Sequence, residues 1–298
     1  QNHQGTTITC HILASHLDEW RTKVIRLNKQ LDTLNLTPES STKTERHLSL
    51  TPYKFPKKQN WDQQLTQTLA MIKEKKLVKT VFAQPFHFNK PSNLNWASQL
   101  PLWCQQTQHT LALFQFKKRL FIVNSPEHLF RRHKQHLSTA AIASTRPRGI
   151  TPSQDQEYEQ QLLTHPKDTQ EHQLVETFIT DTLTKLATNI TQKKLSILKL
   201  PYLQHRHTSI NATLLPSTTD WMLINRLHPT PAVGAIPNTY LPHQKKLEGF
   251  DRGWYSSPIG WLGQHESQFL VGIRSTLLDT EHVHIYAGVG IVKSSQIN

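Results

Sequence analysis

The alternation of hydrophobic and polar positions changes along the chain, and each pattern predicts a different element. Over residues 6–14 β-branched and apolar side chains alternate with polar ones, which predicts a strand. Residues 15–36 carry apolar side chains at helical spacing behind Ser15, a residue type favoured at helix N-caps. We therefore expect an amphipathic helix there. The following segment, 36–60, is polar with three prolines, so we expect a loop.

Beyond residue 60 the pattern alternates between helical and extended stretches. Helical spacing covers 60–76, and it returns from about Asp155 to about Lys194 with a break at Pro166. Short apolar or alternating runs predict one strand over 77–89, two strands over 110–126, a hairpin over 128–144 and a last hairpin over 267–292. Strands, then long helices, then strands favour an α+β fold. We expect large, mostly antiparallel β-sheet layers flanked by helices.

The charge balance narrows the class of partner. Lys and Arg number 34 against 21 Asp and Glu, which gives a formal net charge of +13 and suggests an anionic partner. The basic residues are not gathered in blocks, and the chain has no zinc-finger spacing, so nucleic acid is disfavoured. Only two cysteines are present, without a CxxC pair, which is typical of a reducing compartment. Apolar runs are too short to span a bilayer and no signal peptide is visible, so we expect a cytoplasmic protein without membrane contact.

Two residues are candidates for proton transfer. Lys79 opens a strongly apolar strand, and burial would lower the pKa of its ammonium toward neutral pH. The alternative is a lysine whose stem lies on the sheet while its amine reaches water. Glu127 follows Ser-Pro and precedes an apolar run, so it is either a buried acid or an ordinary charge at the start of an element. Taken singly, each residue favours the structural alternative.

The stretch PKDTQEHQLVE, residues 166–176, is a candidate metal segment. Asp168 suits the first turn of a helix, where it would complement the helix dipole. Glu171 lies three residues further on, so both carboxylates share one helix face. Carboxylate oxygens with several waters are the ligands that Mg²⁺ prefers. The segment is therefore either a magnesium site or the charged start of a helix.

The C-terminal third offers groups for binding an anion. Arg274 lies between apolar residues, where a cation needs a partner such as a carboxylate ligand. Gly288 and Gly290 lie near the end of the last predicted strand, where missing side chains allow a ligand close to the backbone. Tyr255 would add a hydroxyl. His228 in LHPTPAVG is a lone histidine, for which a structural role is the simpler interpretation.

The order of these segments resembles the chorismate-utilising enzyme family, which includes isochorismate synthases, salicylate synthases and the large subunits of anthranilate and aminodeoxychorismate synthases. The resemblance runs from about Trp61 to the end of the chain and is faint before it. It is carried by the segments LVKTVFAQ, SPEHLF, AIASTRPRG, HPKDTQEHQLVE, LPYLQHRHTSI, LHPTPAVGAIP, RGWYSSPIGWL, FLVGIRS and YAGVGIV. LHPTPAVG with RGWYSSPIGW is most similar to isochorismate synthases of the menaquinone and siderophore type. Ser144 stands where the family usually has a glycine.

The resemblance implies a role for each matching residue. Lys79 would be the base that activates water for attack at C2 of chorismate, and Glu127 the acid that protonates the departing C4 hydroxyl. Glu171 would be a Mg²⁺ ligand, with Asp168 near the metal-bound waters. Substrate binding would fall to the remaining positions: Tyr255 and Arg274 for the carboxylate of the enolpyruvyl arm, and Thr145, Thr230, Gly288 and Gly290 for the pocket wall.

The resemblance also implies an organisation and an activity. We expect residues 1–60 to be a weakly matched N-terminal part and residues 61–298 the chorismate-binding catalytic domain. The family carries a further metal-binding glutamate on a helix after the YAGVGIV strand, and we expect this chain, which ends at Asn298, to lack that helix. The implied activity is an isochorismate synthase, with salicylate synthase or a non-catalytic homologue as alternatives. Mg²⁺ and chorismate are the expected ligands, and a monomer or weak dimer is the expected state.

Overall fold

The computed structural model describes residues 17–32, 52–54, 58–92, 94–99 and 109–296. The chain divides into two units, Gln1–Leu48 and Ser49–Asn298. The described part of the first unit is helix α1 (Leu17–Asp32), on which Lys23 forms an ion pair with Glu19 at 2.6 Å. The helix predicted over 15–36 is thus confirmed over 16 residues. The strand predicted over 6–14 and the N-cap residue Ser15 lie outside the described residues.

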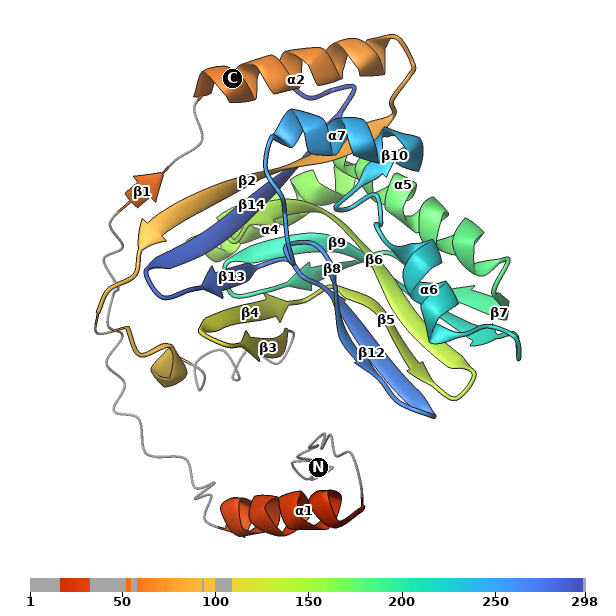
Figure 1. Cartoon of the computed structure of the whole chain (residues 1–298). Helices are drawn as coiled ribbons and strands as arrows, with labels where there is room; N and C mark the ends of the chain where they lie inside the picture. Colours follow the sequence, from red (N-terminus) through yellow and green to blue (C-terminus); the bar gives the residue numbers. More distant parts are fainter. Residues whose placement is uncertain (1–16, 33–51, 55–57, 93, 100–108, 297–298) are drawn as a thin grey trace. The chain divides into compact units, whose positions relative to one another are not determined.

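The second unit contains two antiparallel sheets (Figure 1). In sheet A the strand order is β1-β2-β14-β13-β4-β3, and β10 pairs with β2. The strands β2 and β14 pair along their whole length, from Lys79 opposite Val292 to Asn89 opposite His282. Sheet A comprises β1 (Pro52–Lys54), β2 (Lys79–Asn89), β3 (Thr110–Phe116), β4 (Arg119–Ser125), β10 (Ala235–Ile236), β13 (Ser275–Leu278) and β14 (His282–Val292).

In sheet B the strand order is β11-β12-β5-β6-β9-β7, with β8 beside β9. The long pair β6–β9 has a bulge between Ala143 and Thr145, where Ser144 takes a positive φ of 62°. Sheet B comprises β5 (His128–His133), β6 (His136–Pro147), β7 (Ala187–Gln192), β8 (Ser196–Lys199), β9 (Leu203–Leu214), β11 (Pro258–Leu262) and β12 (Glu266–Val271).

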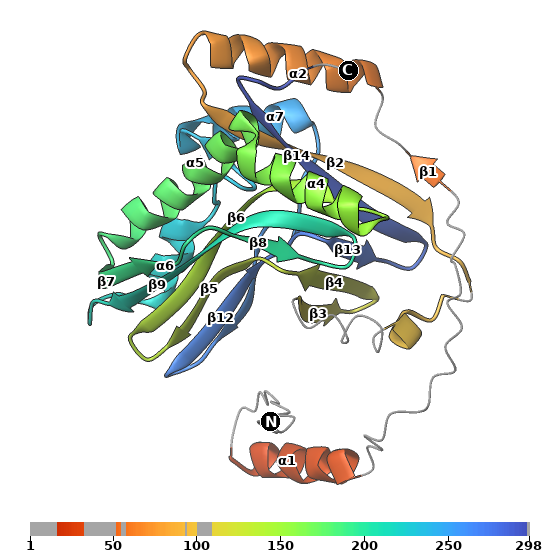
Figure 2. The ribbon, with the colours of Figure 1, turned by 180° about the vertical axis from the view of Figure 1, so that it is seen from behind.

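Helices cover each sheet. Helix α5 packs on β6 with Val175, Ile179 and Leu183, which are spaced by four residues and fully buried in the core of sheet B. Helices α2 and α7 pack against β14 and β2 of sheet A (Figures 1 and 2). The helices are α2 (Lys58–Lys73), α4 (Pro152–Thr164), α5 (Pro166–Leu183), α6 (Asp220–Leu227) and α7 (Leu241–Glu248), with short 3₁₀ segments at Trp96–Gln99 and Asn238–Tyr240.

The predicted α+β class, with mostly antiparallel sheet layers flanked by helices, is confirmed, and three element predictions are wrong. The segment 36–60, expected to be a loop, contains strand β1 and, from Lys58, the start of α2. The helix expected to reach about Lys194 ends at Leu183, and Ala187–Gln192 form strand β7 against β9. The β-branched residues of this segment favour a strand over a helix. Antiparallel pairing with β9 stabilises the extended conformation. The single hairpin expected over 267–292 is three strands, because the chain leaves sheet B after Val271 and enters sheet A at Ser275.

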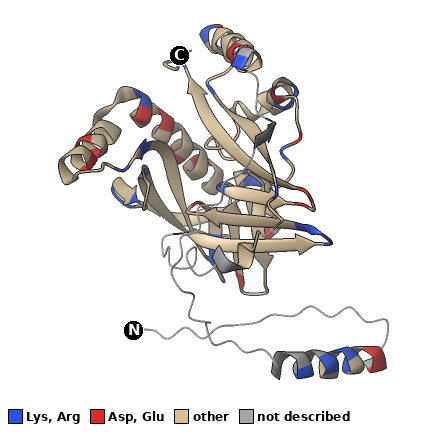
Figure 3. Cartoon of the chain, turned by 90° about the vertical axis from the view of Figure 1, so that its left-hand side faces the viewer, with Lys and Arg blue, Asp and Glu red and all other residues tan. Residues whose placement is uncertain are grey.

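The basic residues are distributed over the molecule and do not form one block, as the sequence indicated. Lys and Arg are spread over several helices and loops, and Asp and Glu lie on the same helices (Figure 3). Among the described residues, no helix combines the length and the apolar character that crossing a membrane requires. The domain boundary predicted at residue 60 stays a prediction.

Candidate active site

A cavity of about 520 Å³ is lined by strands of both sheets and by helix α5. This volume suits a small-molecule ligand. Most of the residues singled out in the sequence line it: Glu127, Thr145, Asp168, Glu171, Tyr255, Arg274, Gly288 and Gly290. Lys79 and Thr230 are buried immediately behind the wall, 0% and 4% exposed. The structure therefore brings together residues that are more than 200 positions apart in the sequence, such as Lys79 and Gly290.

Lys79 and Glu171 form a buried ion pair at one end of the cavity. Lys79 is the first residue of β2, and its Nζ lies 2.9 Å from Oε1 of Glu171 on α5. Burial lowers the pKa of the Lys79 ammonium, and the facing Glu171 carboxylate offsets part of this effect. Burial alone would raise the pKa of Glu171, but Lys79 and a hydrogen bond from Ser144 lower it overall. Lys79 is therefore more easily deprotonated than an exposed lysine, and Glu171 is more easily ionised than an exposed glutamate.

Gly290 makes room for this pair. A Cβ atom at Gly290 would lie 2.3 Å from Oε1 of Glu171, which is far inside van der Waals contact. The same Cβ would lie 3.6 Å from Cε of Lys79, so the lysine stem also borders this wall. The glycine is required here by the close approach of a carboxylate to the backbone of β14.

Ser144 holds the other carboxylate oxygen of Glu171. Its Oγ donates to Oε2 of Glu171 at 3.1 Å, and it also lies 3.1 Å from the carbonyl oxygen of Asp168. The positive φ of Ser144 explains why a glycine suits this position, because L-residues other than Gly, Asn and Asp rarely adopt it. The serine thus accepts backbone strain at the bulge, and its hydroxyl is a hydrogen-bond donor that a glycine would not have.

Asp168 lies one helical turn before Glu171 and has a different partner. Its Oδ2 accepts a hydrogen bond from Nη2 of Arg146 at 2.8 Å. Its side chain is 9% exposed, and Arg146 forms its shortest ion pair, with Nδ1 of His165 3.8 Å from the same oxygen. Of the two carboxylates predicted to bind a metal, Asp168 is therefore the one already neutralised by an arginine, while Glu171 faces a lysine whose own pKa is lowered.

Glu127 is a buried acid on the opposite wall. It lies between β4 and β5, and its side chain is almost completely enclosed. Burial raises its pKa to about 7, although Lys79 and Arg274 lower it in part. Its backbone is fixed on both sides, since its N–H donates to Oγ of Ser125 at 3.1 Å and its carbonyl accepts from the N–H of Val271 at 3.0 Å. Because burial raises its pKa to about 7, this carboxyl group is protonated in a substantial fraction of molecules at neutral pH.

Arg274 is a half-buried cation that forms no ion pair with a carboxylate of the described residues. It occupies the crossing between the two sheets with a φ of +50°. Its guanidinium contacts two imidazoles, Nε2 of His205 at 2.6 Å and Nε2 of His109 at 3.1 Å. Burial, followed by the charge of Arg274, lowers the pKa of His205 to about 4, so this imidazole is neutral. Glu127 interacts electrostatically with this guanidinium, but no carboxylate of the described residues forms an ion pair with it at the cavity wall.

Tyr255 and Gly288 shape the remaining wall. The ring of Tyr255 stacks on that of Tyr286 with centroids 5.0 Å apart, and its hydroxyl would lie 2.8 Å from a Cβ at Gly288. Burial raises the pKa of Tyr255 to about 12, so the hydroxyl keeps its proton and can donate a hydrogen bond. This glycine, like Gly290, provides space for a polar group of the cavity.

Sequence reasoning missed the residues that hold the predicted ones in place. His205 accepts from Arg274 through Nε2, and its Nδ1 lies 2.9 Å from Oγ1 of Thr145, so it connects two predicted binding residues. Arg146 balances Asp168, and Lys167 lies on the cavity wall. His205 and Arg146 lie within matched segments, but the segments do not show which of their polar residues turn inward. Alternation along β9 could have placed His205 on the inner face.

The comparisons with known proteins agree with this arrangement. The family model described as "Chorismate binding enzyme" matches residues 1–298. Isochorismate synthase 2 of Arabidopsis thaliana, a chloroplastic protein, is 40% identical over 180 residues, which cover 59% of this chain and 32% of that protein. Isochorismate synthase MenF of Pasteurella multocida is 32% identical over 245 residues, which cover 79% of this chain and 56% of that protein.

Solved structures show the same fold. The menaquinone-specific isochorismate synthase MenF of Escherichia coli superposes with a TM-score of 0.78 at 27% identity, covering 93% of this chain and 64% of that one. Component I of anthranilate synthase from Streptococcus pneumoniae gives a TM-score of 0.77 at 19% identity, over 93% of this chain and 62% of that one, and supports the fold alone. The chain spans about a third to a little over half the length of the curated relatives with which it is compared here. Because this family model matches residues 1–298, the chain belongs to the chorismate-binding enzyme family.

Proposed function

We propose that this chain is an isochorismate synthase, which converts chorismate to isochorismate. The observation that carries the proposal is the Arg274 guanidinium, which has no ion pair among the described residues, in a cavity lined by Glu127 with its raised pKa and backed by the buried Lys79. Chorismate has two carboxylates, a hydroxyl that must leave and a ring carbon that must accept water. The cavity offers a matching set of a cation, an acid and a base.

The reaction exchanges one hydroxyl position for another. The oxygen of a water molecule forms a bond to C2, the two ring double bonds shift, and the bond between C4 and its oxygen breaks. Lys79, in its neutral form, takes a proton from the attacking water, and Glu127 gives a proton to the departing hydroxyl, which leaves as water. Atoms balance because one water enters and one leaves. Base and acid catalysis of this type contributes about 10²–10⁴-fold each.

Substrate binding follows from the charges of the wall. The carboxylate of the enolpyruvyl arm would pair with Arg274, whose planar guanidinium accepts a carboxylate in a bidentate manner. The protonated hydroxyl of Tyr255 would donate to the same group. Thr145 is held by His205, and Thr230 is buried beside Glu127 and helps to lower its pKa. Gly288 and Gly290 leave room on β14 for the Tyr255 hydroxyl and the Glu171 carboxylate, which would face the substrate.

A magnesium ion suits the remaining end of the cavity. Glu171 is the fitting ligand, because its side chain is 14% exposed on the cavity wall and the absent side chain of Gly290 leaves space around its carboxylate. Asp168 is the weaker donor, since Arg146 already balances it. Mg²⁺ needs only one or two carboxylates when it also keeps waters and binds an anionic substrate. Bound there, the ion would supply charge to hold the ring carboxylate.

The proposal is tested by incubating the purified chain with chorismate and Mg²⁺ and separating the products by chromatography. Isochorismate as the accumulating product is the expected result. Salicylate together with pyruvate would assign the chain to salicylate synthases, in which isochorismate is an intermediate. A folded chain that binds chorismate and leaves it unchanged would identify a non-catalytic homologue and would overturn the proposed activity.

A further inference from the structure

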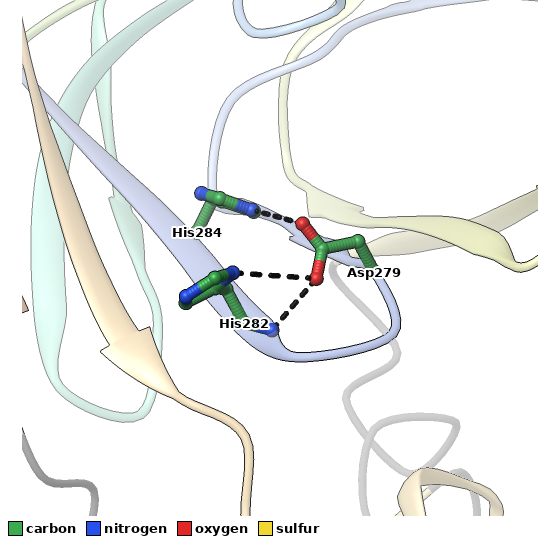
Figure 4. A group of neighbouring side chains, drawn as sticks. All are labelled: Asp279, His282 and His284. Carbon is green, nitrogen blue, oxygen red and sulfur yellow. Dashed lines mark hydrogen bonds and ion pairs between the residues drawn. The ribbon is translucent and has the colours of Figure 1, made fainter.

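A second group of potential metal ligands lies at the turn between β13 and β14, outside the cavity described above. Asp279, His282 and His284 each offer one ligand atom, and these atoms all lie within 4.8 Å of one another. Oδ2 of Asp279 lies 2.9 Å from Nε2 of His284, and Oδ1 lies 3.6 Å from Nδ1 of His282 (Figure 4). The two imidazoles thus present nitrogens to the two oxygens of one carboxylate.

The turn that carries these residues is fixed by backbone contacts. Oδ1 of Asp279 accepts the N–H groups of Glu281 at 2.8 Å and His282 at 2.7 Å. Lys90, just after β2, donates its N–H to the carbonyl of Glu281 and its Nζ to the carbonyl of Asp279. The loop therefore holds the carboxylate in place before any ligand arrives, which reduces the entropy cost of binding.

A third imidazole orients His284. His87 on β2 lies directly opposite His284 in the strand register, and the two Nδ1 atoms are 2.6 Å apart. When Nδ1–H of His284 donates to His87, Nε2 of His284 carries the lone pair and faces the carboxylate. Metal-binding histidines usually have such a partner on the second ring nitrogen, which fixes the tautomer and strengthens the ligand. His87 fills that position here.

Hydrogen bonding alone accounts for only part of this arrangement. An aspartate at a turn commonly accepts nearby backbone N–H groups, so the contacts to Glu281 and His282 need no metal. That motif does not explain why two further imidazoles converge on the same carboxylate. Each imidazole can share a proton with its own oxygen of Asp279, but only a single cation can accept lone pairs from the carboxylate and both imidazoles together.

The donor set identifies the class of ion. Two imidazole nitrogens with one carboxylate suit zinc and neighbouring transition metals, and Mg²⁺ prefers oxygen ligands alone. Three protein ligands leave one position of a tetrahedral ion for water or another ligand. The side chains are 18–25% exposed, so the site is accessible from solvent.

We propose that Asp279, His282 and His284 bind one zinc-type divalent ion, with His87 as the positioning residue for His284. The site is separate from the cavity. None of the three ligands lines the cavity, whose nearest residue on the same face of β14 is Tyr286, two positions or roughly 7 Å along the strand from His284. The ion would tie the β13–β14 turn to β2 through the pair of His284 and His87. The inference does not depend on the proposed activity.

The test is a titration of the full chain with Zn²⁺ against a chromophoric chelator, in excess Mg²⁺. One zinc per chain is expected, and Mg²⁺ should not displace it. His282→Ala and His284→Ala should each weaken binding by about 100-fold or more. His87→Ala should weaken it by about 10–100-fold, as loss of an orienting partner does. Replacement of Zn²⁺ by Co²⁺ should give the visible absorption of a low-coordinate site in the wild type.

Two matched controls separate this site from others. His133→Ala removes an exposed histidine that lies 3.6 Å from Glu266 without a third ligand, and it should bind zinc as the wild type does. Glu171→Gln should also keep the zinc, which separates the site from the cavity. If a ligand variant misfolds, Asp279→Asn keeps an acceptor oxygen for the turn and should still lose the ion. Absence of zinc in the wild type, or unchanged affinity in folded His282→Ala and His284→Ala, would overturn the proposal.

Discussion

The two ends of the β2–β14 pair have the same backbone ladder and very different side chains. At one end Lys79 is fully buried against Glu171, and Gly290 provides the space for that contact. At the other end His87 and His284 lie opposite each other near Asp279, partly exposed. The first end has a carboxylate suited to a hard ion and a lysine of lowered pKa, and the second has imidazoles suited to zinc. Burial at the first end lowers the pKa of Lys79. Partial exposure at the second end leaves the imidazoles and the carboxylate accessible to a metal ion.

The largest expected effect lies at the buried end. Lys79→Met keeps the apolar stem and removes the amine, so we expect isochorismate formation to fall by about 10³-fold or more, since the base is lost. The rate is measured by chromatography in saturating chorismate, with circular dichroism as the check on folding. A variant that retains more than a tenth of the wild-type rate would contradict the assignment of Lys79 as the base.

The next effect concerns stability and pH. The pKa of Glu127 is raised from 4.5 to about 7, so the folded chain binds the proton more tightly than the unfolded chain does. Stability from this group is fully present below about pH 4.5 and is lost as the pH rises through about 7. Keeping the ionised acid buried at pH 8 costs about 3 kcal/mol.

Glu127→Gln removes that cost. The free energy of unfolding of the variant, relative to the wild type, should increase by up to about 3 kcal/mol between pH 4 and pH 8. Denaturant titrations at the two pH values measure it. A relative stability that does not change with pH would show that Glu127 is ionised at its ordinary pKa.

A smaller effect is expected from the glycines of β14. Gly290→Ala would place a methyl group 2.3 Å from Glu171, so that carboxylate must move away from Lys79. We expect turnover to fall by about 10–100-fold, as small displacements of catalytic groups do. Gly288→Ala is the matched control, because its methyl group meets the Tyr255 hydroxyl at 2.8 Å and should cost less. Equal turnover of both variants and the wild type would contradict the close packing described here.

The smallest effect is expected at the exposed end. Without metal, His284→Ala removes one partly exposed pair with Asp279 and should lower the free energy of unfolding by less than about 1 kcal/mol. With zinc present, the wild type should gain thermal stability and the variant should not. A large loss of stability in the metal-free variant would show that this cluster is a structural core element, and the difference between the two ends would disappear.

Sequence patterns predicted most of the elements and the membership of the cavity, and the failures have physical reasons. Four of the predicted site residues stand in recognisable segments, and the fold brings them to the wall of one cavity or directly behind it: Lys79, Glu127, Glu171 and Arg274. The exit of the chain from sheet B after Val271 was not predictable, because an apolar run in two different sheets has the same alternation as one long strand. His205 and the group at Asp279 were missed since their meaning depends on strand register, which local pattern does not give.

The most direct test of the account is the equilibrium affinity for chorismate of the wild type and Arg274→Gln, measured by calorimetry in Mg²⁺. Gln keeps polarity and much of the length but removes a charge that forms no ion pair with a carboxylate of the described residues. We predict that the variant binds chorismate about 10²–10³-fold more weakly, because the substrate carboxylate loses its half-buried cation. Wild-type affinity in a folded Arg274→Gln chain would contradict the claim that this cavity is built around an anion held by Arg274.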